Sequence, residues 1–414
     1  MKIDMKKITA FILLSVIITI TGSKAIIVAK INTTKPELDD AIPVTAMADP
    51  KMDLVSPSAV LMEGSTGKVL FEKNKDERLK PASITKIMTL LLIFEALEKG
   101  QIKLTDDVSV SEHAASMGGS QVFLEPYEVQ KVETMIKCIS IASANDASVA
   151  MAEHIAGSEE EFVARMNAKA KELGMNNTNF VNCTGLDTDN HYTTAYDVAL
   201  MSRELITKYP QISNYATIWM DTFVHNTKKG QTEFGLTNTN KLIKSYQGIT
   251  GLKTGSTSIA KYCVSATARR NNMDLIAVIM AAPDTKTRFM EAAKLLNYGF
   301  ANYSIYVDDN KDVAIEPVRV VKGAKDFVEG KVSKEFIYLC DKTKTSENIR
   351  KETVLYDKIE APVKADDKIG EIVYYYNNNE KIGSVDILAL TDVDKAGFMD
   401  CFTKILKRFF VAYR

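Results

Sequence analysis

The stretch KPASITKIMTLLL at residues 80–92 places Ser83 three positions before Lys86 and then continues as an apolar helix. Residues three apart on a helix share a face, so the Lys86 amine can reach the Ser83 hydroxyl. A helix start also offers free backbone N–H groups and a positive dipole end, which favour developing negative charge. The spacing therefore predicts either an ordinary surface lysine or a serine activated by a neighbouring amine.

Taken alone, this spacing is a weak signal, because serine and lysine are common residues. The same S-x-x-K spacing recurs at Ser65 and Lys68, where we expect an exposed turn between two strands. An S-x-N sequence also occurs twice, at residues 143–145 and 346–348, and the second lies in a charged loop. The order of the motifs along the chain must therefore separate a catalytic set from chance.

Two further motifs follow in the chain. S-A-N at residues 143–145 interrupts the helical spacing predicted for residues 132–154, and K-T-G at residues 253–255 comes just before a predicted strand. A lysine acts as a base only when it is neutral, which burial and a second nearby cation favour. Lys253 is the candidate for that second cation, and Gly255 would let a substrate backbone approach the strand edge closely.

Together these motifs resemble the active-site signature of the low-molecular-mass penicillin-binding proteins, the serine D-alanyl-D-alanine carboxypeptidases of bacterial cell-wall metabolism, including their sporulation-type members. The resemblance covers about residues 45–414. It is carried by LKPASITKIMT, MGGSQVFLEP, IASANDASVAMAEHIAG, NFVNCTGLDTDNHYTTAYDVA, GLKTGST and APVKADDKIG. Motifs of this length in this order make the resemblance specific.

The resemblance implies a catalytic role for four residues. Ser83 would be the nucleophile that forms an acyl-enzyme, and Lys86 would be its general base. Ser143 would pass a proton to the leaving D-alanine, while Asn145 would orient Lys86 and the substrate amide. The substrates would be peptidoglycan stem peptides ending in D-Ala-D-Ala, and β-lactam antibiotics would be covalent inhibitors. No cofactor and no metal ion is implied.

The resemblance also implies a set of substrate-binding residues, which are Lys253, Thr254, Gly255 and Ser256. Lys253 and Thr254 would bind the terminal carboxylate, and the strand after them would pair with the peptide as an added strand. The backbone N–H groups of Ser83 and Ser256 would form the oxyanion hole.

Three positions depart from the family pattern. Ala144 stands where many relatives have glycine, a change that we expect to be harmless. Ser256 stands where some relatives have histidine, which leaves the tuning of deacylation open. Tyr127 replaces a glycine of a tight turn, which predicts a local change in that loop.

The patterns predict an α+β fold with four parts. Residues 48–305 would form a transpeptidase-like catalytic domain, in which an antiparallel sheet from both ends of the domain packs on a helical block. Residues 306–395 contain short alternating runs and predict a small all-β domain. Within residues 1–47, the basic MKIDMKK and the apolar ITAFILLSVIITITG predict an export signal, either cleaved or kept as an anchor. The fourth part is the C-terminal segment 396–414.

This segment predicts attachment to a membrane surface. Written as a helix, residues 398–414 carry one apolar stripe, and Lys404, Lys407 and Arg408 lie on the other face. The stripe consists of Phe398, Phe402, Ile405, Leu406, Phe409 and Tyr413. Such a helix lies on anionic lipid, which would place the enzyme at the outer face of the cytoplasmic membrane, facing the cell wall. The alternative is a helix that packs on the β domain.

Composition excludes several other classes of protein. The 52 basic and 53 acidic residues are balanced and give no indication of nucleic-acid binding. The five cysteines and four histidines show no metal-binding spacing. A serine β-lactamase on the same fold is one alternative, but the E-x-x-L-N loop of class A enzymes is missing and a β domain is added. A catalytically idle wall-associated homologue is another alternative, against which the intact motifs argue.

Overall fold

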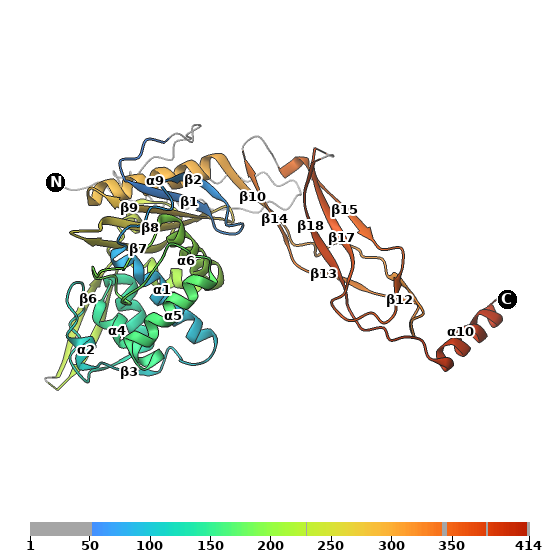
Figure 1. Cartoon of the computed structure of the whole chain (residues 1–414), viewed down its shortest axis with the longest axis horizontal. Coiled ribbons are helices and arrows are strands. Elements are labelled where there is room, and N and C mark those ends of the chain that lie inside the picture. Colours follow the sequence, from blue (N-terminus) through green and yellow to red (C-terminus); the bar gives the residue numbers. More distant parts are fainter. Residues whose placement is uncertain (1–51, 229, 342–345, 378–379, 412–414) are drawn as a thin grey trace, which may run out of the picture. The chain divides into compact units, whose positions relative to one another are not determined.

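The first domain is built on a five-stranded antiparallel sheet in the order β2-β1-β9-β8-β7 (Figure 1). The computed structural model describes residues 52–228, 230–341, 346–377 and 380–411, so the predicted export segment lies outside the described residues. The strands are β1 (Ser58–Glu63), β2 (Val69–Lys73), β7 (Ile249–Thr257), β8 (Lys261–Arg270) and β9 (Met273–Ala282). Because β1 pairs with β9, the two ends of the domain meet in one sheet, as predicted.

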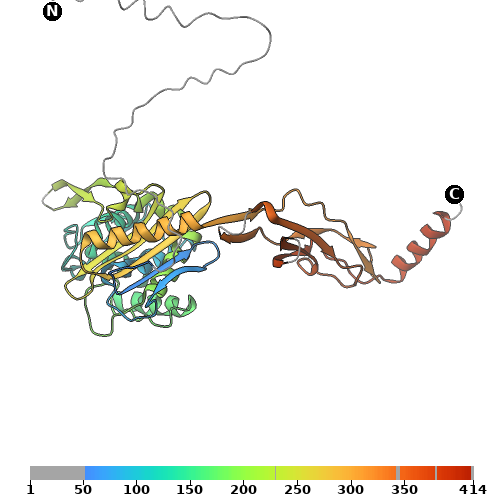
Figure 2. The same cartoon turned by 90° about the horizontal axis from the view of Figure 1, so that it is seen from above.

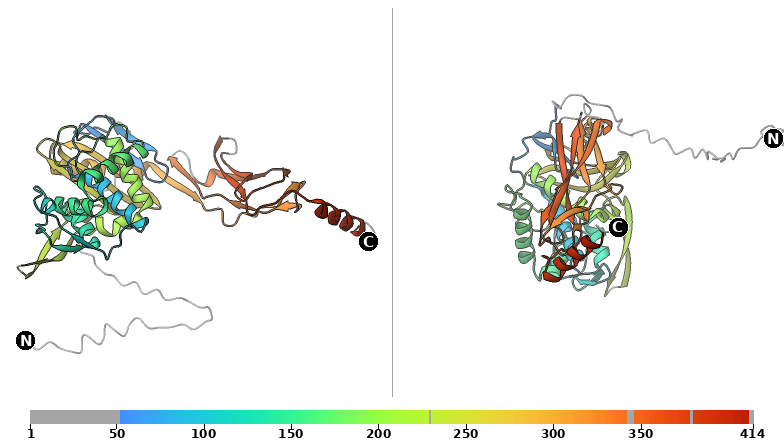
Figure 3. Two further views of the ribbon diagram at one scale, coloured as in Figure 1. Left: turned by 60° about the horizontal axis from the view of Figure 1, so that its bottom comes forward. Right: turned by 90° about the vertical axis from the view of Figure 1, so that its right-hand side faces the viewer.

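The sheet has a helical layer on each face. The alternation of side chains along β9 shows the two layers, because successive residues of a strand point to opposite faces. Leu275, Ala277 and Ile279 join the apolar cluster of α9 (Thr285–Asn302), whereas Ile276, Val278 and Met280 join the cluster of the helical block. Figure 2 shows α9 lying across one face of the strands, and the left view of Figure 3 shows the helical block.

At the centre of the helical block lies α1 (Lys86–Glu98), which is buried along most of its length. A helix that is apolar all round belongs in the interior of a domain. The helices around it are α3 (Val132–Lys137), α4 (Asn145–Ala156), α5 (Glu159–Glu172) and α6 (Ala195–Lys208). Ser158 and Thr194 begin α5 and α6 with the side-chain caps expected of these residues.

The predicted interruption at residues 143–145 is present. After α3, residues Cys138–Ala142 form one π turn (η3), and Ser143 then adopts a left-handed conformation with φ of 63°. The chain re-enters a helix at Asn145, the first residue of α4. Single π turns inside helices often accompany functional sites, because they change the direction in which the next side chains point.

The sequence did not predict the hairpin of β5 (Met220–Thr227) and β6 (Gly230–Thr237). These two strands form a sheet of their own and are mostly exposed, so they lack the apolar alternation that signals a half-buried strand. The remaining short elements are β3 (Asp107–Ser109), β4 (Val129–Lys131), α2 (Glu112–Ala115), α7 (Ser213–Ala216), α8 (Leu242–Ser245), and the 3-10 turns η2 (Ala82–Thr85) and η4 (Pro210–Ile212).

The second domain is all-β, as predicted. Its largest sheet has the order β13-β18-β17-β15, and the right view of Figure 3 shows these strands in orange and red. Its core includes Tyr374, whose ring stacks on Phe336 at 3.6 Å between centroids. The strands are β10 (Tyr303–Asp308), β11 (Val318–Val321), β12 (Phe327–Val328), β13 (Gly330–Val332), β14 (Phe336–Asp341), β15 (Ile349–Leu355), β16 (Ile359–Glu360), β17 (Lys368–Tyr376) and β18 (Glu380–Ala389), with the 3-10 turn η5 (Ser346–Asn348) before β15.

A last helix, α10 (Phe398–Val411), follows this domain. Within the described ranges, no helix is both long enough and apolar enough to cross a bilayer. The boundaries drawn from the sequence at residues 48–305, 306–395 and 396–414 stay predictions.

Candidate active site

The Lys86 amine lies at the centre of a hydrogen-bonded group that includes Ser83. Its Nζ lies 3.1 Å from Ser83 Oγ, 2.6 Å from Asn145 Oδ1 and 2.7 Å from the backbone oxygen of Thr184. Ser83 is located in the 3-10 turn η2, directly before α1, rather than in the helix itself. The turn leaves Ser83 partly exposed, while Lys86 is fully buried. The predicted pairing of serine and lysine is therefore present.

Burial changes the acid–base behaviour of Lys86. Loss of hydration lowers the pKa of the Lys86 amine from 10.5 to about 7, although the neighbouring Cys183 and Asp146 act in the opposite direction. At pH 7 about half of such amines are neutral, against roughly one in 3,000 at the ordinary pKa. The environment therefore supplies a neutral base next to the Ser83 hydroxyl.

The amide of Asn145 is held in one orientation. Its Nδ2 donates to the backbone oxygen of Gly118 at 2.7 Å, which directs Oδ1 toward Lys86. The backbone N–H of Asn145 donates to the oxygen of Ser120, also at 2.7 Å. Asn145 thus joins α4 to the irregular segment around Gly118 and orients the Lys86 amine.

The Ser143 hydroxyl is available to bind a ligand or to transfer a proton. Its side chain is buried, and its hydroxyl oxygen has no hydrogen-bond partner in the part of the chain that the structure describes. A residue other than glycine with φ of 63° is uncommon, and such conformations gather at functional sites. The hydroxyl therefore keeps its donor and acceptor capacity free.

The K-T-G motif lies inside β7 and not before a strand, so that prediction is wrong. β7 is the edge strand of the sheet, whereas β8, the strand after the motif, already has neighbours on both sides. A strand with two partners has no free hydrogen-bonding edge. An added peptide strand can therefore pair with β7 itself, and not with the following strand as the sequence suggested.

Lys253 is as deeply buried as Lys86. Burial lowers its pKa well below the ordinary value, and the charges of Lys86 and Arg288 lower it further. Burial is thus the main cause of the lowered pKa of both amines, and repulsion between them adds to it only at Lys253. The idea that Lys253 is the cation that keeps Lys86 neutral is not supported. Beside it, the Thr254 hydroxyl donates to Thr239 Oγ1 at 2.6 Å.

Gly255 allows β7 to touch the turn that carries Ser83. A Cβ at this position would lie 2.7 Å from the Ser83 nitrogen and 2.9 Å from the Ile84 nitrogen, which real side chains do not tolerate. The close approach is therefore made by the protein's own turn and not by a substrate backbone as predicted. It places the N–H of Ser83 beside β7, where the next residue, Ser256, is exposed.

Sequence reasoning missed a loop that completes the site. The side chain of Asn182 accepts hydrogen bonds from the N–H groups of Thr184 and Gly185, which fixes a tight turn. Gly185 adopts φ of 87°, and a Cβ there would lie 1.9 Å from the oxygen of Ala82. This turn carries the Thr184 oxygen that accepts from Lys86. The only sequence signal was the N-C-T-G run itself, because a backbone oxygen has no signature.

Arg288 was also missed. Its Nη1 donates to the backbone oxygens of Gly255 and Cys263 at 3.1 and 3.3 Å. Arg288 belongs to α9 and follows these two strand residues by 33 and 25 positions in the chain. Its Nε has no hydrogen-bond partner within the described residues. No sequence signal marked it, because the buried face of α9 also contains the polar residues Glu291 and Asn297. The residue adds positive charge near Lys253.

Two further residues, His191 and Tyr127, bear on the surroundings of the site. His191 is buried and has structural contacts: its Nδ1 accepts from the Val181 N–H and its Nε2 lies 3.0 Å from Thr85 Oγ1. Burial and the charge of Lys80 lower its pKa to about 4, so the ring is neutral at pH 7. Tyr127 adopts φ of 66°, a conformation that suits the family's glycine, so the backbone turn is kept despite the substitution.

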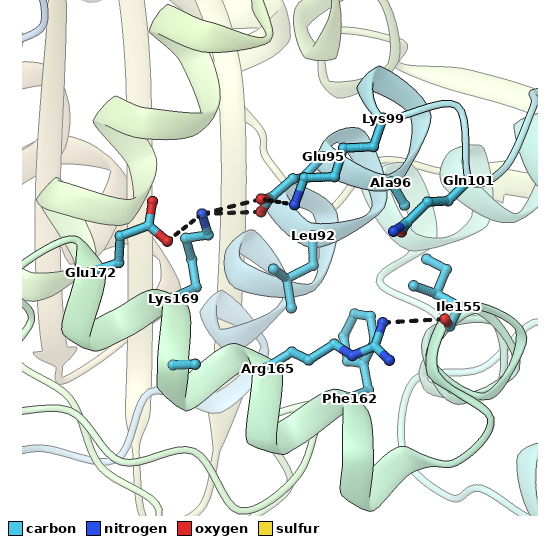
Figure 4. A pocket seen from close by; sticks show the side chains of 11 residues that line it. Leu92, Glu95, Ala96, Lys99, Gln101, Ile155, Phe162, Arg165, Lys169 and Glu172 are labelled. Carbon is cyan, nitrogen blue, oxygen red and sulfur yellow. Dashed lines mark hydrogen bonds and ion pairs between the residues drawn. The ribbon is translucent and has the colours of Figure 1, made fainter.

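A cavity of about 200 Å³ lies at the opposite end of α1 from Lys86 (Figure 4). Its charged residues neutralise one another, with Lys169 between Glu95 and Glu172, and Lys99 also on Glu95. None of the predicted catalytic residues lines it. Among the described residues, no cluster of three or more side chains could hold a metal ion. The candidate site is therefore the region around Ser83 and not this cavity.

Comparison with known proteins gives two family matches and close relatives. The D-alanyl-D-alanine carboxypeptidase model matches residues 44–284, and the model of the penicillin-binding protein 5 C-terminal domain matches residues 300–395. The chain is 48% identical to the D-alanyl-D-alanine carboxypeptidase DacF of Bacillus subtilis over 342 residues, which covers 83% of this chain and 87% of the relative. It is 34% identical to the D-alanyl-D-alanine carboxypeptidase DacC of Escherichia coli over 346 residues, covering 82% and 84%.

A solved structure agrees with these matches. Penicillin-binding protein 5 from Haemophilus influenzae superposes with a TM-score of 0.70 at 32% identity, covering 83% of this chain and 99% of that one. The predicted fold, a transpeptidase-like domain followed by a small all-β domain, is confirmed. The chain belongs to the D-alanyl-D-alanine carboxypeptidase family of penicillin-binding proteins.

Proposed function

We propose that Ser83 and Lys86 carry out the D-alanyl-D-alanine carboxypeptidase reaction of this family through an acyl-enzyme. Neutral Lys86 takes the proton of the Ser83 hydroxyl as Ser83 attacks the carbonyl between the two D-alanines. The observation that carries this proposal is the 3.1 Å approach of a fully buried amine to the serine. Its pKa of about 7 matches the demands of a general base near neutral pH.

Ser143 and Asn145 assist this step. The Ser143 hydroxyl, which has no partner among the described residues, passes a proton to the leaving D-alanine. Asn145 holds the Lys86 amine by its Oδ1 and is available to orient the substrate amide. Water then hydrolyses the acyl-enzyme, and Lys86 again acts as the base. A penicillin acylates Ser83 in the same way.

The oxyanion hole is formed by the backbone N–H groups of Ser83 and Ser256. The close packing of Gly255 on the Ser83 nitrogen supports this pairing, because it brings the two chain segments together without a side chain between them. Donors fixed in this way stabilise the negative charge that develops on the carbonyl oxygen.

The terminal carboxylate of the peptide binds at Lys253 and Thr254, with Arg288 nearby, while the peptide backbone pairs with the free edge of β7. Burial keeps the pKa of Lys253 low, and a bound carboxylate reverses this by supplying the missing counter-charge. Binding and protonation of Lys253 are therefore coupled. Gly255 and Ser256 line the path of the peptide along the strand.

Replacing Lys253 by glutamine is expected to slow penicillin acylation by at least ~10-fold, the scale of one lost charged hydrogen bond. The measurement is the second-order rate of labelling by a fluorescent penicillin. Peptides amidated at the C-terminus should be poor substrates even for the native enzyme. Equal turnover of amidated and free-acid peptides would remove the basis for this carboxylate site.

Release of D-alanine from a pentapeptide ending in D-Ala-D-Ala tests the function directly. Labelling with a fluorescent penicillin distinguishes a carboxypeptidase from the two alternatives, a serine β-lactamase and a catalytically idle homologue. A carboxypeptidase stays labelled, a β-lactamase turns the label over, and an idle homologue stays dark. An unlabelled native protein would overturn the proposal.

We also propose that α10 attaches the enzyme to an anionic membrane surface outside the cytoplasm. Phe398 and Ile405 are 83% and 60% exposed, and Met399, Phe402 and Leu406 are exposed as well. Exposed apolar residues on one helix are suited to the lipid interface. Lys404 was expected on the basic face that lies on anionic lipid. Instead, its Nζ donates to Asp326 Oδ1 at 2.5 Å and to the Gly323 oxygen, and these contacts join the helix to the β domain.

A chain that starts after the export segment and ends at Asp394 is therefore expected to remain active on a soluble peptide and to lose binding to anionic liposomes. The chain that keeps α10 should bind them, less strongly as the salt concentration rises. Co-sedimentation with liposomes measures both. If the truncated chain binds as well as the longer one, the helix is not the anchor.

A further inference from the structure

Residues 118–124, which we call the wall segment, run beside Asn145 without forming a helix or a strand. Backbone N–H groups in such a segment need partners other than a regular ladder or helix. The wall segment finds several of its partners on two successive residues at the start of α4. These residues are Asn145 and Asp146.

Asp146 holds the second half of the wall segment. The carboxylate is completely buried, and its Oδ2 accepts hydrogen bonds from the N–H groups of Val122 and Leu124, both at 3.1 Å. Its Oδ1 also accepts from the Ala147 N–H at 2.9 Å. Val122 and Leu124 both lie more than twenty positions away from Asp146 in the chain.

Asn145 holds the first half. It donates to the oxygens of Gly118 and Ser120, and a Cβ at Gly119 would lie 2.9 Å from Asn145 Nδ2. The wall segment is thus held at both ends by neighbouring residues of one helix. The orientation of the Asn145 amide, and with it the acceptor offered to Lys86, depends on where the wall segment lies.

We propose that Asp146 is a positioning residue for acylation: its buried carboxylate fixes the wall segment, and the wall segment fixes Asn145 against Lys86. An amide at position 146 has only one acceptor oxygen, so it cannot serve both the Ala147 N–H and the N–H groups of Val122 and Leu124. The segment then moves, and the Asn145 amide loses its orientation. The inference rests on the proposed roles of Lys86 and Asn145.

Asp146 also acts on Lys86 through its charge. The ionisable groups that face Lys86 are the Cys183 thiol in the loop, Asp146 in α4 and Lys253 in β7. The charge of Asp146 raises the pKa of Lys86 and so opposes the effect of burial. A neutral residue at position 146 should therefore move the pH midpoint of acylation to lower pH. A purely structural role would not produce this shift.

The test compares Asp146→Asn with Glu63→Gln. Glu63 is an equally buried carboxylate that accepts from the N–H groups of Ser65 and Thr66 in the β1–β2 turn, away from the catalytic group. We expect D146N to slow penicillin acylation at least ~10-fold, the scale of a small misplacement in an active site. We also expect a lower pH midpoint and faster hydrogen exchange in the wall segment. E63Q should keep the native rate and midpoint.

A second variant, Gly119→Ala, disturbs the contact between the wall segment and Asn145 without altering Asp146. It should also slow acylation, and it keeps the test informative if D146N does not fold. Native acylation rates in D146N and G119A, or an equal loss in E63Q, would overturn the inference. Failure of the proposed function is distinguishable, since the native enzyme itself would then not be labelled.

Discussion

Replacing Ser83 by alanine is expected to abolish both D-alanine release and covalent penicillin labelling, with a loss of at least about 10⁴-fold in each. Both activities need the same acylation of one hydroxyl, and the structure places Ser83 Oγ 3.1 Å from the Lys86 amine. Single-turnover labelling and D-alanine release measure the two losses separately.

Ser65→Ala is the matched control. Ser65 also precedes a lysine by three positions, but it lies in the exposed β1–β2 turn, where its N–H donates to Glu63. Both activities should survive in this variant. Labelling that persists in the Ser83 variant would assign the nucleophile to another residue.

Replacing Lys86 by methionine should lower the acylation rate by about 10³-fold, within the range lost with a general base. Methionine keeps most of the buried volume but cannot take the Ser83 proton. In the native enzyme the neutral fraction of Lys86 grows with pH, so acylation should rise about tenfold per pH unit below pH 7 and level off above it. The residual rate of the variant should lack this rise.

Lys68→Met, at the exposed turn, is the control for this variant. A native profile that continues to rise up to pH 10 would show that Lys86 keeps its ordinary pKa. That result would contradict its role as the neutral base, because burial is what lowers its pKa.

The sequence predicted those parts of the site that depend on the type of side chain and on the spacing of residues close together in the chain. Ser83, Lys86, Ser143 and Asn145 have the functional groups that the proposed chemistry needs, and the break in the helix before Asn145 was visible in the apolar spacing. Lys86 and Asn145 lie in helices and Ser143 lies in the break between helices, as predicted. Hydrogen bonds join Lys86 to Ser83 and Asn145.

What could not be predicted depends on contacts between distant segments. The Thr184 oxygen is 98 positions from Lys86, and a backbone oxygen looks the same at every residue. The position of K-T-G on an edge strand depends on the order of strands in the sheet, which is a property of the whole domain. Gly255 was expected to serve the substrate, because the sequence does not reveal the turn that fills the space beside it.

The tight packing around Ser83, the proposed nucleophile, limits how this enzyme could become resistant to β-lactam drugs. Gly255 and Gly185 touch the Ser83 turn from two sides, and neither position has room for even one methyl group. A substitution there that excludes the drug would also displace Ser83 and so inactivate the enzyme toward its natural peptide. Selection for resistance with retained activity must therefore act at positions other than these two glycines.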